Sequence, residues 1–187
     1  MCIVYLVGIK HSGKSSVGRQ AVELLHKTRA VEFTDTDNLI HSLLPSPYFS
    51  IREFYRHAGA AAFRELELRA LQTWLDQVSP SLHVVALGGG ACDNEPLIQV
   101  MQSSGIIIYL AVEESVLLQR ILQHGIPPFL SAEDPRQSFH TLYERRNSRY
   151  RQFSDYVLQL YDCRSIPENA EILAKTIQKI AGKRGHV

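Results

Sequence analysis

The chain contains 187 residues, a length that suits one compact domain with a substantial hydrophobic core. Hydrophobic residues make up 45% of the chain and charged residues 21%, as in ordinary globular proteins and unlike disordered ones. The formal net charge of +1 provides no general field that would attract nucleic acid or anionic lipid. We therefore expect a single domain over residues 1–187 that binds neither nucleic acid nor a membrane.

The cysteines and histidines argue against a zinc site. Cys2, Cys92 and Cys163 lie far apart, and the eight histidines show neither H-x-x-x-H nor H-E-x-x-H spacing. The apolar run at 2–7 is too short for the core of a signal peptide, and no segment approaches the roughly 18 apolar residues of a membrane span. We expect free thiols, a cytoplasmic location and a monomer.

Short apolar runs alternate with longer helical patterns, which predicts βαβ units and a parallel sheet buried on both faces. The candidate strands are residues 2–7, 30–34, 83–87, 106–111 and 156–161. The candidate helices, which carry apolar residues at helical spacing, are 14–27, 60–78, 94–103, 113–123, 135–150 and 167–181. Asp134 and Pro135 are a typical cap and first-turn residue for the helix at 135–150. This order of elements predicts an α/β fold.

Two proline-containing segments interrupt the alternation. Residues 44–48, with Pro45 and Pro47, indicate a turn or a small insertion after a helix. Residues 124–129 combine a glycine with two prolines between two predicted helices. This second interruption fits a mobile lid at about 124–134.

The segment Gly8-Ile9-Lys10-His11-Ser12-Gly13-Lys14-Ser15 matches G-x-x-x-x-G-K-[ST] between a predicted strand and a predicted helix, as a phosphate-binding loop requires. Its glycines let backbone N–H groups point inward, and the following helix adds the positive end of its dipole. Lys14 can reach the β- and γ-phosphates, and the Ser15 hydroxyl is a candidate Mg²⁺ ligand. We expect ATP or GTP here, and no N-K-x-D motif indicates guanine. The candidate nucleotide-binding residues of this segment are His11, Ser12, Gly13, Lys14, Ser15 and Ser16.

The segment Asp35-Thr36-Asp37 follows the second predicted strand, so both carboxylates should emerge at the carboxyl edge of the sheet, where ligands of open α/β folds bind. One carboxylate can act on the Mg²⁺ shell while the other meets an acceptor hydroxyl. The alternative is structural, because Asp37 precedes Asn38-Leu39-Ile40 and can cap a helix. Taken alone, the segment leaves both open.

Three further segments carry candidate acceptor-binding groups. Arg64 and Glu67 stand at i,i+3 on a predicted helix, either as a surface ion pair or with Glu67 orienting the Arg64 guanidinium toward a substrate carboxylate. Gly88-Gly89-Gly90 follows a predicted strand, where a ligand can approach the backbone closely. Residues 144–151 are densely basic, which is typical of a solvated helix face or, less often, of a nucleic-acid patch.

These motifs together resemble those of one family. The phosphate loop, Asp35-Thr36-Asp37, Phe63-Arg64-Glu65-Leu66-Glu67, Gly88-Gly89-Gly90 and the R-x-x-x-Y of Arg146 to Tyr150 occur in the order seen in shikimate kinases. The resemblance spans nearly the whole chain. It implies a three-layer α/β/α P-loop kinase fold with a five-stranded parallel sheet and a lid, and transfer of the γ-phosphate of ATP to the 3-hydroxyl of shikimate.

The resemblance also implies a role for each matching residue. Lys14 and Asp37 would be catalytic, with Asp37 binding the reacting hydroxyl and able to act as base. The residues that would bind shikimate are Asp37, Arg64, Gly88, Gly89, Gly90 and Arg146, the two arginines acting on its carboxylate. Ser15 and Asp35 would hold Mg²⁺, Asp35 through water. Arg120 aligns with an arginine that stacks on adenine, although a helical surface arginine is an alternative at this position.

The sequence departs from the family pattern at two positions. His11 stands where the family usually has glycine. Pro127 stands where relatives have a lid arginine, in a pattern like R-P-L-L, and no Lys or Arg occurs from 121 to 135. An arginine at a phosphoryl-transfer transition state contributes about 10³- to 10⁵-fold in rate. Either another arginine substitutes, or activity is low, or the acceptor is not shikimate.

Two other functions therefore stay open at this point. One is a kinase of the same fold that acts on another compact acceptor, such as gluconate or a nucleotide, because a phosphate would satisfy the same two arginines. The other is a nucleotide-binding relative with weakened catalysis. Pro127 favours the second, whereas the intact acceptor-binding motifs weigh against it.

We predict that Arg136, which opens the helix after the lid, substitutes for the missing lid arginine. Arg136→Ala should then lower kcat by about tenfold or more, because positive charge is lost at the transition state. A coupled assay of ADP release measures the effect, and an unchanged kcat would remove Arg136 from this role.

Overall fold

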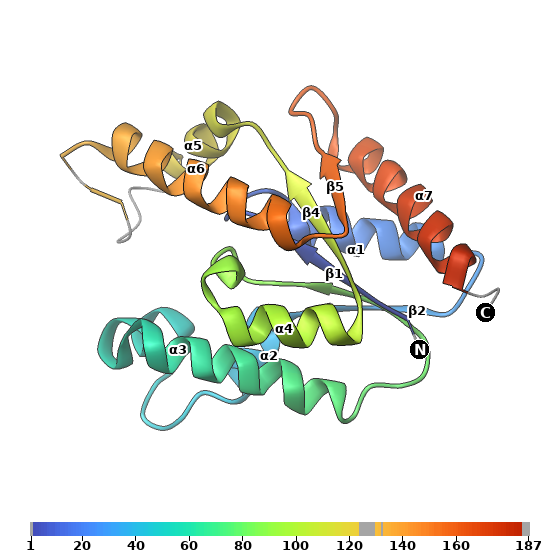
Figure 1. The fold of residues 1–187 in the computed structure, drawn as a ribbon, viewed down its shortest axis with the longest axis horizontal. Helices are drawn as coiled ribbons and strands as arrows, with labels where there is room; N and C mark the ends of the chain where they lie inside the picture. Colours follow the sequence, from blue (N-terminus) through green and yellow to red (C-terminus); the bar gives the residue numbers. More distant parts are fainter. Residues whose placement is uncertain (1, 124–129, 132, 185–187) are drawn as a thin grey trace.

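The structure is a computed structural model that describes residues 2–123, 130–131 and 133–184. Its centre is a five-stranded sheet in which all neighbouring strands run parallel, in the order β2-β3-β1-β4-β5 (Figure 1). The strands are β1 (Cys2–Val7), β2 (Val31–Asp35), β3 (Leu82–Ala86), β4 (Ile106–Ala111) and β5 (Tyr156–Gln159). All of them were predicted, and their ends differ from the predicted ones by at most about two residues, as boundaries commonly do.

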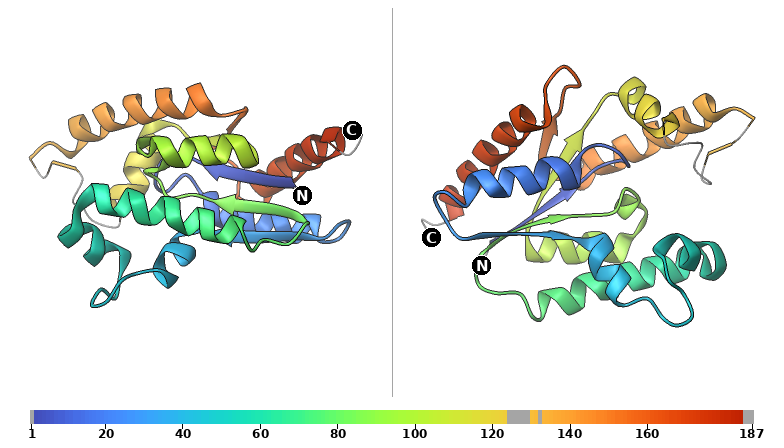
Figure 2. Two further views of the ribbon diagram at one scale, coloured as in Figure 1. Left: turned by 60° about the horizontal axis from the view of Figure 1, so that its bottom comes forward. Right: turned by 180° about the vertical axis from the view of Figure 1, so that it is seen from behind.

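Helices cover both faces of the sheet, which confirms the predicted three-layer α/β/α fold. They are α1 (Lys14–Leu25), α2 (Thr36–Ser42), α3 (Ile51–Leu75), α4 (Glu95–Ser104), α5 (Glu114–Leu122), α6 (Pro135–Phe153) and α7 (Ile166–Arg184), with a short 3-10 helix, η1 (Ala91–Asp93). Helices α1 and α7 pack together on one face, and α3, α4 and α6 lie on the other (Figures 1 and 2). No helix in the described part of the chain is long and apolar enough to cross a membrane.

The main core lies around the three central strands. Strands β3 and β4 are buried along their whole length, and β1 from its second residue onward. Strands covered on both faces need apolar side chains at every position, which explains the unbroken runs at 3–7 and 106–111. The edge strands β2 and β5 carry partly exposed side chains instead. The sheet is thus a rigid base for the loops at its ends.

The candidate helices did not include α2, which the sequence indicated only as an alternative for Asp37 and as the helix before the turn at 44–48, and they missed residues 51–59 of α3. The helical rise of α3 is interrupted at Gly59, whose φ of 84° and ψ of 175° lie outside the helical region. Positive φ favours glycine, and this break obscures the apolar spacing of the segment. Ile40 and Phe54 nevertheless form a second small hydrophobic cluster with Leu66 and Ala70. This cluster holds α2 against the middle of α3, where Arg64 is located.

Parallel strands all end at the same edge of the sheet. The loops that start there are 8–13 after β1, 87–90 after β3 and 160–165 after β5, while α2 begins directly where β2 ends. The expected cap of α6 is confirmed, since the Asp134 carboxylate accepts a hydrogen bond from the Gln137 N–H at 2.9 Å. Most of the predicted lid, including Pro127, lies outside the described residues.

Candidate active site

The loop between β1 and α1 curls through positive φ angles. Gly8 has φ 156°, His11 φ 65° and Gly13 φ 90°. His11 is therefore in the left-handed region, where a Cβ costs about 1–2 kcal/mol. A Cβ on Gly8 would lie 2.9 Å from the backbone oxygen of Leu110, so this position has room only for glycine. The backbone keeps the shape of a phosphate loop, although a histidine occupies a position where glycine would be unstrained.

Lys14, the first residue of α1, folds back over this loop. Its Nζ donates to the carbonyl oxygens of Gly8 at 2.8 Å and Ile9 at 3.0 Å, and its side chain is buried. Burial lowers the pKa of Lys14 to about 8, against the opposing charges of Asp37 and Asp35. The ammonium is thus held at the centre of the loop, beside two carboxylates.

Asp35 and Asp37 have different environments. Asp35 caps α2 by accepting from the Asp37 N–H at 3.0 Å, and its other oxygen accepts from Ser15 Oγ at 2.6 Å. The cap of α2 is therefore Asp35, which corrects the interpretation that Asp37 caps this helix. Burial, followed by the charge of Asp35, raises the pKa of Asp37. Asp37 is a carboxylate with increased basicity that no helix cap uses.

Glu67 does not orient Arg64, so both sequence interpretations of this pair are wrong. Its carboxylate accepts from Asn94 Nδ2 at 3.0 Å, and the same amide donates to the backbone oxygen of Arg64 at 2.9 Å. No ion pair joins Arg64 to Glu67 among the described residues. Glu67 is buried, and this burial raises its pKa to about 7. The i,i+3 spacing wrongly predicted a contact between the two side chains, because that of Glu67 is buried and that of Arg64 is exposed.

The three glycines after β3 lie against the other parts of the site. A Cβ on Gly88 would lie 3.3 Å from Glu67 Oε1 and 3.7 Å from Asp37 Oδ1. A Cβ on Gly89 would lie 2.7 Å from the backbone nitrogen of Lys10, which leaves no room for a side chain. The absence of side chains therefore allows this segment to touch the phosphate loop.

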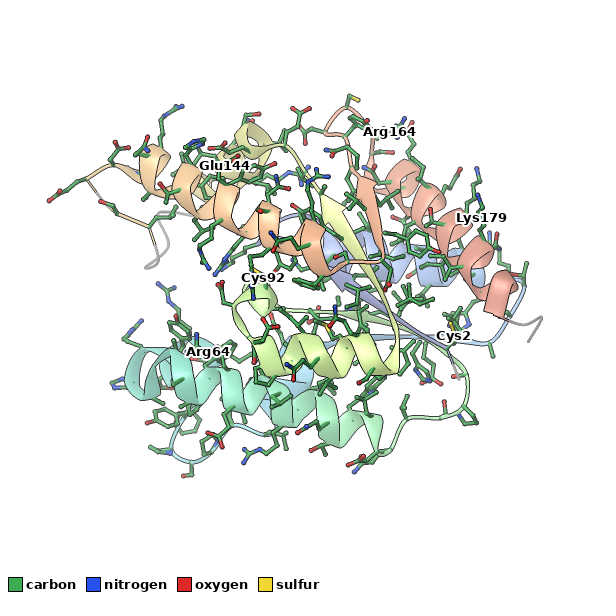
Figure 3. The ribbon with its side chains drawn as sticks, in the orientation of Figure 1. Cys2, Arg64, Cys92, Glu144, Arg164 and Lys179 are labelled. Atoms are coloured by element: carbon green, nitrogen blue, oxygen red, sulfur yellow. The ribbon has the colours of Figure 1, made fainter. Side chains whose placement is uncertain are left out.

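Arg146 reaches the glycine segment from α6. Its Nη1 donates to the Gly89 oxygen at 2.9 Å, and its Nη2 donates to Asp93 Oδ2 at 2.8 Å. Its Nε is buried and has no partner among the described residues. In Figure 3 the loop with Cys92 lies between Arg64 on α3 and helix α6. Arg146 thus contacts this loop from α6, while the backbone of Arg64 on α3 is joined to it through Asn94.

A cavity of about 370 Å³ opens on the other side of the phosphate loop. Residues of the loop and of α1 line it together with Arg120 of α5 and with the segment between β5 and α7. The Arg120 guanidinium donates to the His11 oxygen at 3.0 Å and to Asp162 at 2.6 Å. The lining residues that sequence reasoning missed are Val17, Val112, Leu160, Tyr161, Arg164, Ile166 and Asn169. Several of them follow β5 and therefore lie at the carboxyl edge of the sheet, where ligands of such folds bind. Their position after a predicted strand could have identified them as candidate binding residues.

The fold and the site define a P-loop phosphotransferase. They combine a parallel sheet with a glycine-rich phosphate loop, a buried lysine and two carboxylates beside that loop. The model of the family described as shikimate kinase matches residues 10–181. The chain belongs to the shikimate kinase family.

Individual relatives agree with this assignment. The shikimate kinase of Caldanaerobacter subterraneus is 31% identical, with 96% of this chain and 98% of the relative covered. That of Chlorobaculum tepidum is also 31% identical, with 95% and 91% covered. The structure of the Acinetobacter baumannii shikimate kinase in complex with shikimate matches with a TM-score of 0.77 at 28% identity, covering 98% of this chain and 94% of the other.

The contact between Gly89 and Lys10 leads to a stability prediction. Gly89→Ala should lower the unfolding free energy by about 1–3 kcal/mol, because the new methyl group meets backbone that cannot rotate away. Gly90→Ala is the matched control, since its Cβ would lie 3.5 Å from Arg146 Nη2, an ordinary contact. Chemical denaturation measures both variants, and equal losses would contradict the argument.

Glu67 leads to a prediction about pH. Its folded-state pKa of about 7 lies above the ordinary 4.5, so its contribution is fully present below about 4.5 and is lost as pH rises through about 7. Glu67→Gln stays neutral, so its unfolding free energy relative to the wild type should rise by about 2–3 kcal/mol between about pH 5 and about pH 8.

Glu65→Gln is the control for this measurement, because Glu65 is exposed on the same helix. Denaturant titrations at the two pH values give the difference directly. A Glu67→Gln curve that stays parallel to the wild type would show that the buried carboxyl does not titrate in this range.

Proposed function

We propose that the chain phosphorylates the 3-hydroxyl of shikimate with ATP, using the residues described above. The observation that carries the proposal is the convergence of Lys14, Asp37 and Arg146 at one end of the sheet. The charges of Asp37 and Arg146 both act on the pKa of Lys14, in opposite directions. Phosphate-binding, base and carboxylate-binding groups thus share one site, as a kinase for a small hydroxy acid requires.

The nucleotide would lie across the phosphate loop. Backbone N–H groups of 8–13 and the start of α1 would bind the phosphates, with Lys14 turning from the loop carbonyls to the β- and γ-phosphates. The cavity beside Arg120 would receive adenine. Arg120 is held there by His11 and Asp162, so its position is fixed before the nucleotide arrives.

Ser15 and Asp35 are suited to hold Mg²⁺. Both offer oxygen atoms, the ligands that this ion prefers, and Ser15 Oγ lies 2.6 Å from Asp35 Oδ2. The ion would neutralise charge on the β- and γ-phosphates. The direct ligand would be Ser15, and Asp35 would act through water.

Asp37 would accept the proton of the reacting hydroxyl. The bond from that oxygen to the γ-phosphorus forms as the bond from phosphorus to the β-bridging oxygen breaks, and ADP leaves. A raised pKa brings Asp37 closer to the pH at which a general base works best. Gly88 would leave the space that the ring of the acceptor needs beside this carboxylate.

The acceptor's carboxylate would bind Arg146 and Arg64. Arg146 uses Nη1 and Nη2 for Gly89 and Asp93, and a carboxylate at its Nε would satisfy a donor that is otherwise buried without a partner. Arg64 is exposed, and its guanidinium makes no hydrogen bond or ion pair with any described residue. It can therefore turn toward an acid without breaking an existing contact.

A coupled ADP-release assay with shikimate, gluconate and nucleoside monophosphates tests the function. Shikimate alone should give a strong acceptor-dependent signal, and Lys14→Met should lower kcat by about 10²- to 10³-fold. Lys10→Met is the control, because Lys10 is an exposed lysine of the same loop. A signal with another acceptor would redirect the assignment, and no signal with any acceptor would favour a nucleotide-binding relative.

A further inference from the structure

Asp93 lies between two neighbouring arginines of α6. Arg146 Nη2 donates to Asp93 Oδ2 at 2.8 Å, and Arg145 donates to both carboxylate oxygens, with Nη2 at 3.3 Å from Oδ2. Burial works to raise the pKa of Asp93, but the Arg145 hydrogen bond and the Arg146 charge lower it below its ordinary value. The carboxylate is therefore ionised at neutral pH. Asp93 is the last residue of η1, the short helix that follows the glycine segment directly, so it belongs to the rim of the acceptor site.

An ionised Asp93 creates a difficulty for the site. A carboxylate bound to Arg146 reduces the attraction of that guanidinium for a second carboxylate. The acceptor's acid group has to bind the same arginine. Arg146 and Asp93 alone would form a neutral pair, so that only the exposed Arg64 would offer a net positive charge to the incoming anion.

Arg145 changes this balance. With Arg145 present, two guanidinium groups share one carboxylate, so the three side chains keep one positive charge for the acceptor. Arg146 is the more buried of the two, with 16% of its side chain exposed, against 56% for Arg145. Arg145 thus stands on the solvent side of Asp93, whereas Arg146 faces the glycine segment.

We propose that Arg145 is a positioning residue that sets the affinity for the acceptor's carboxylate by neutralising Asp93, without touching the substrate. The proposal rests on the proposed function, since it needs an acceptor that carries a carboxylate. Asp93 keeps the Arg146 guanidinium oriented on the Gly89 oxygen, and Arg145 cancels the charge that this orientation requires. Affinity for the acid therefore depends on a pair of side chains outside the phosphate-transfer path.

Steady-state kinetics of charge-neutral variants test this proposal. Arg145→Gln should raise the KM for shikimate by about three- to tenfold, the range expected for one partly screened charge. The kcat and the KM for ATP should stay unchanged. The double variant Arg145→Gln/Asp93→Asn should regain a large part of the lost affinity, because the uncompensated carboxylate is gone.

Arg149→Gln is the matched control on the same helix. Arg149 donates to Glu95, an acid at the start of α4, at 2.7 Å and to the Cys92 backbone oxygen at 3.4 Å. Among the described residues, it forms no hydrogen bond or ion pair with Asp93 or Arg146. Its KM for shikimate should match the wild type. A second control uses the carboxamide of shikimate, for which Arg145→Gln and the wild type should have the same KM because no charge is bound.

Several outcomes would overturn the proposal. One is an unchanged KM for shikimate in Arg145→Gln, and another is a double variant whose KM for shikimate is as high as that of the single variant. A third is an equal rise in the KM for the carboxamide, which would indicate a merely structural effect. A wild-type chain that prefers a different carboxylic acid would refute the proposed function alone, and the same comparison then applies to that acid. A preferred acceptor without any acid group would refute both.

Discussion

The pairing of β1 with β3 on one side and β4 on the other is the constraint on which the site depends. Because β1 is central and parallel to both neighbours, the phosphate loop must emerge directly beside the glycine segment that follows β3. A Cβ on Gly89 would meet the backbone of Lys10 at 2.7 Å, which shows how closely the two loops approach. The distance between nucleotide and acceptor is thereby fixed by strand pairing, and mobile side chains only complete it.

Opposite charges buried together give the site its chemistry. Burial lowers the pKa of Lys14 and raises the pKa values of Asp37 and Glu67, so each pKa lies closer to neutral pH than its ordinary value does. Asp37 and Asp35 favour the charged form of Lys14, whereas neighbouring carboxylates add to the raised pKa values of Asp37 and Glu67. Perturbed pKa values of this kind cluster at functional sites. A bound phosphate or carboxylate changes these neighbours, so binding and protonation are coupled here.

Local patterns predicted the fold and the motifs because both depend on spacing along the chain. The apolar runs of β1 and β4 are unambiguous, and the phosphate loop combines a strand, two glycines and a lysine in a short segment. The partners of Glu67 and Arg146 were not predictable in this way. Asp93 lies between the three glycines and the predicted helix at 94–103, and Asn94 is the first residue of that predicted helix. Both residues meet α3 and α6 only through the packing of three separate elements. The first part of α3 was missed for a local reason. The break at Gly59 interrupts the regular spacing of apolar residues, although the helix continues on both sides of it.

The two departures from the family pattern have different consequences. At His11 the backbone keeps a positive φ, and its carbonyl accepts from Arg120, so the loop retains its shape at the cost of local strain. Pro127, by contrast, lacks the positive charge of the arginine that relatives have at this position. The backbone conformation of the loop cannot supply that charge.

An arginine that replaces this charge must move to the γ-phosphate, and the cost of moving depends on what it leaves. Arg120 would leave Asp162, and Arg145 would leave Asp93, whereas Arg136 is exposed and binds no described residue. Arg136 can therefore move without breaking an ion pair, and its position in the first turn of α6 connects it directly to the segment that follows α5.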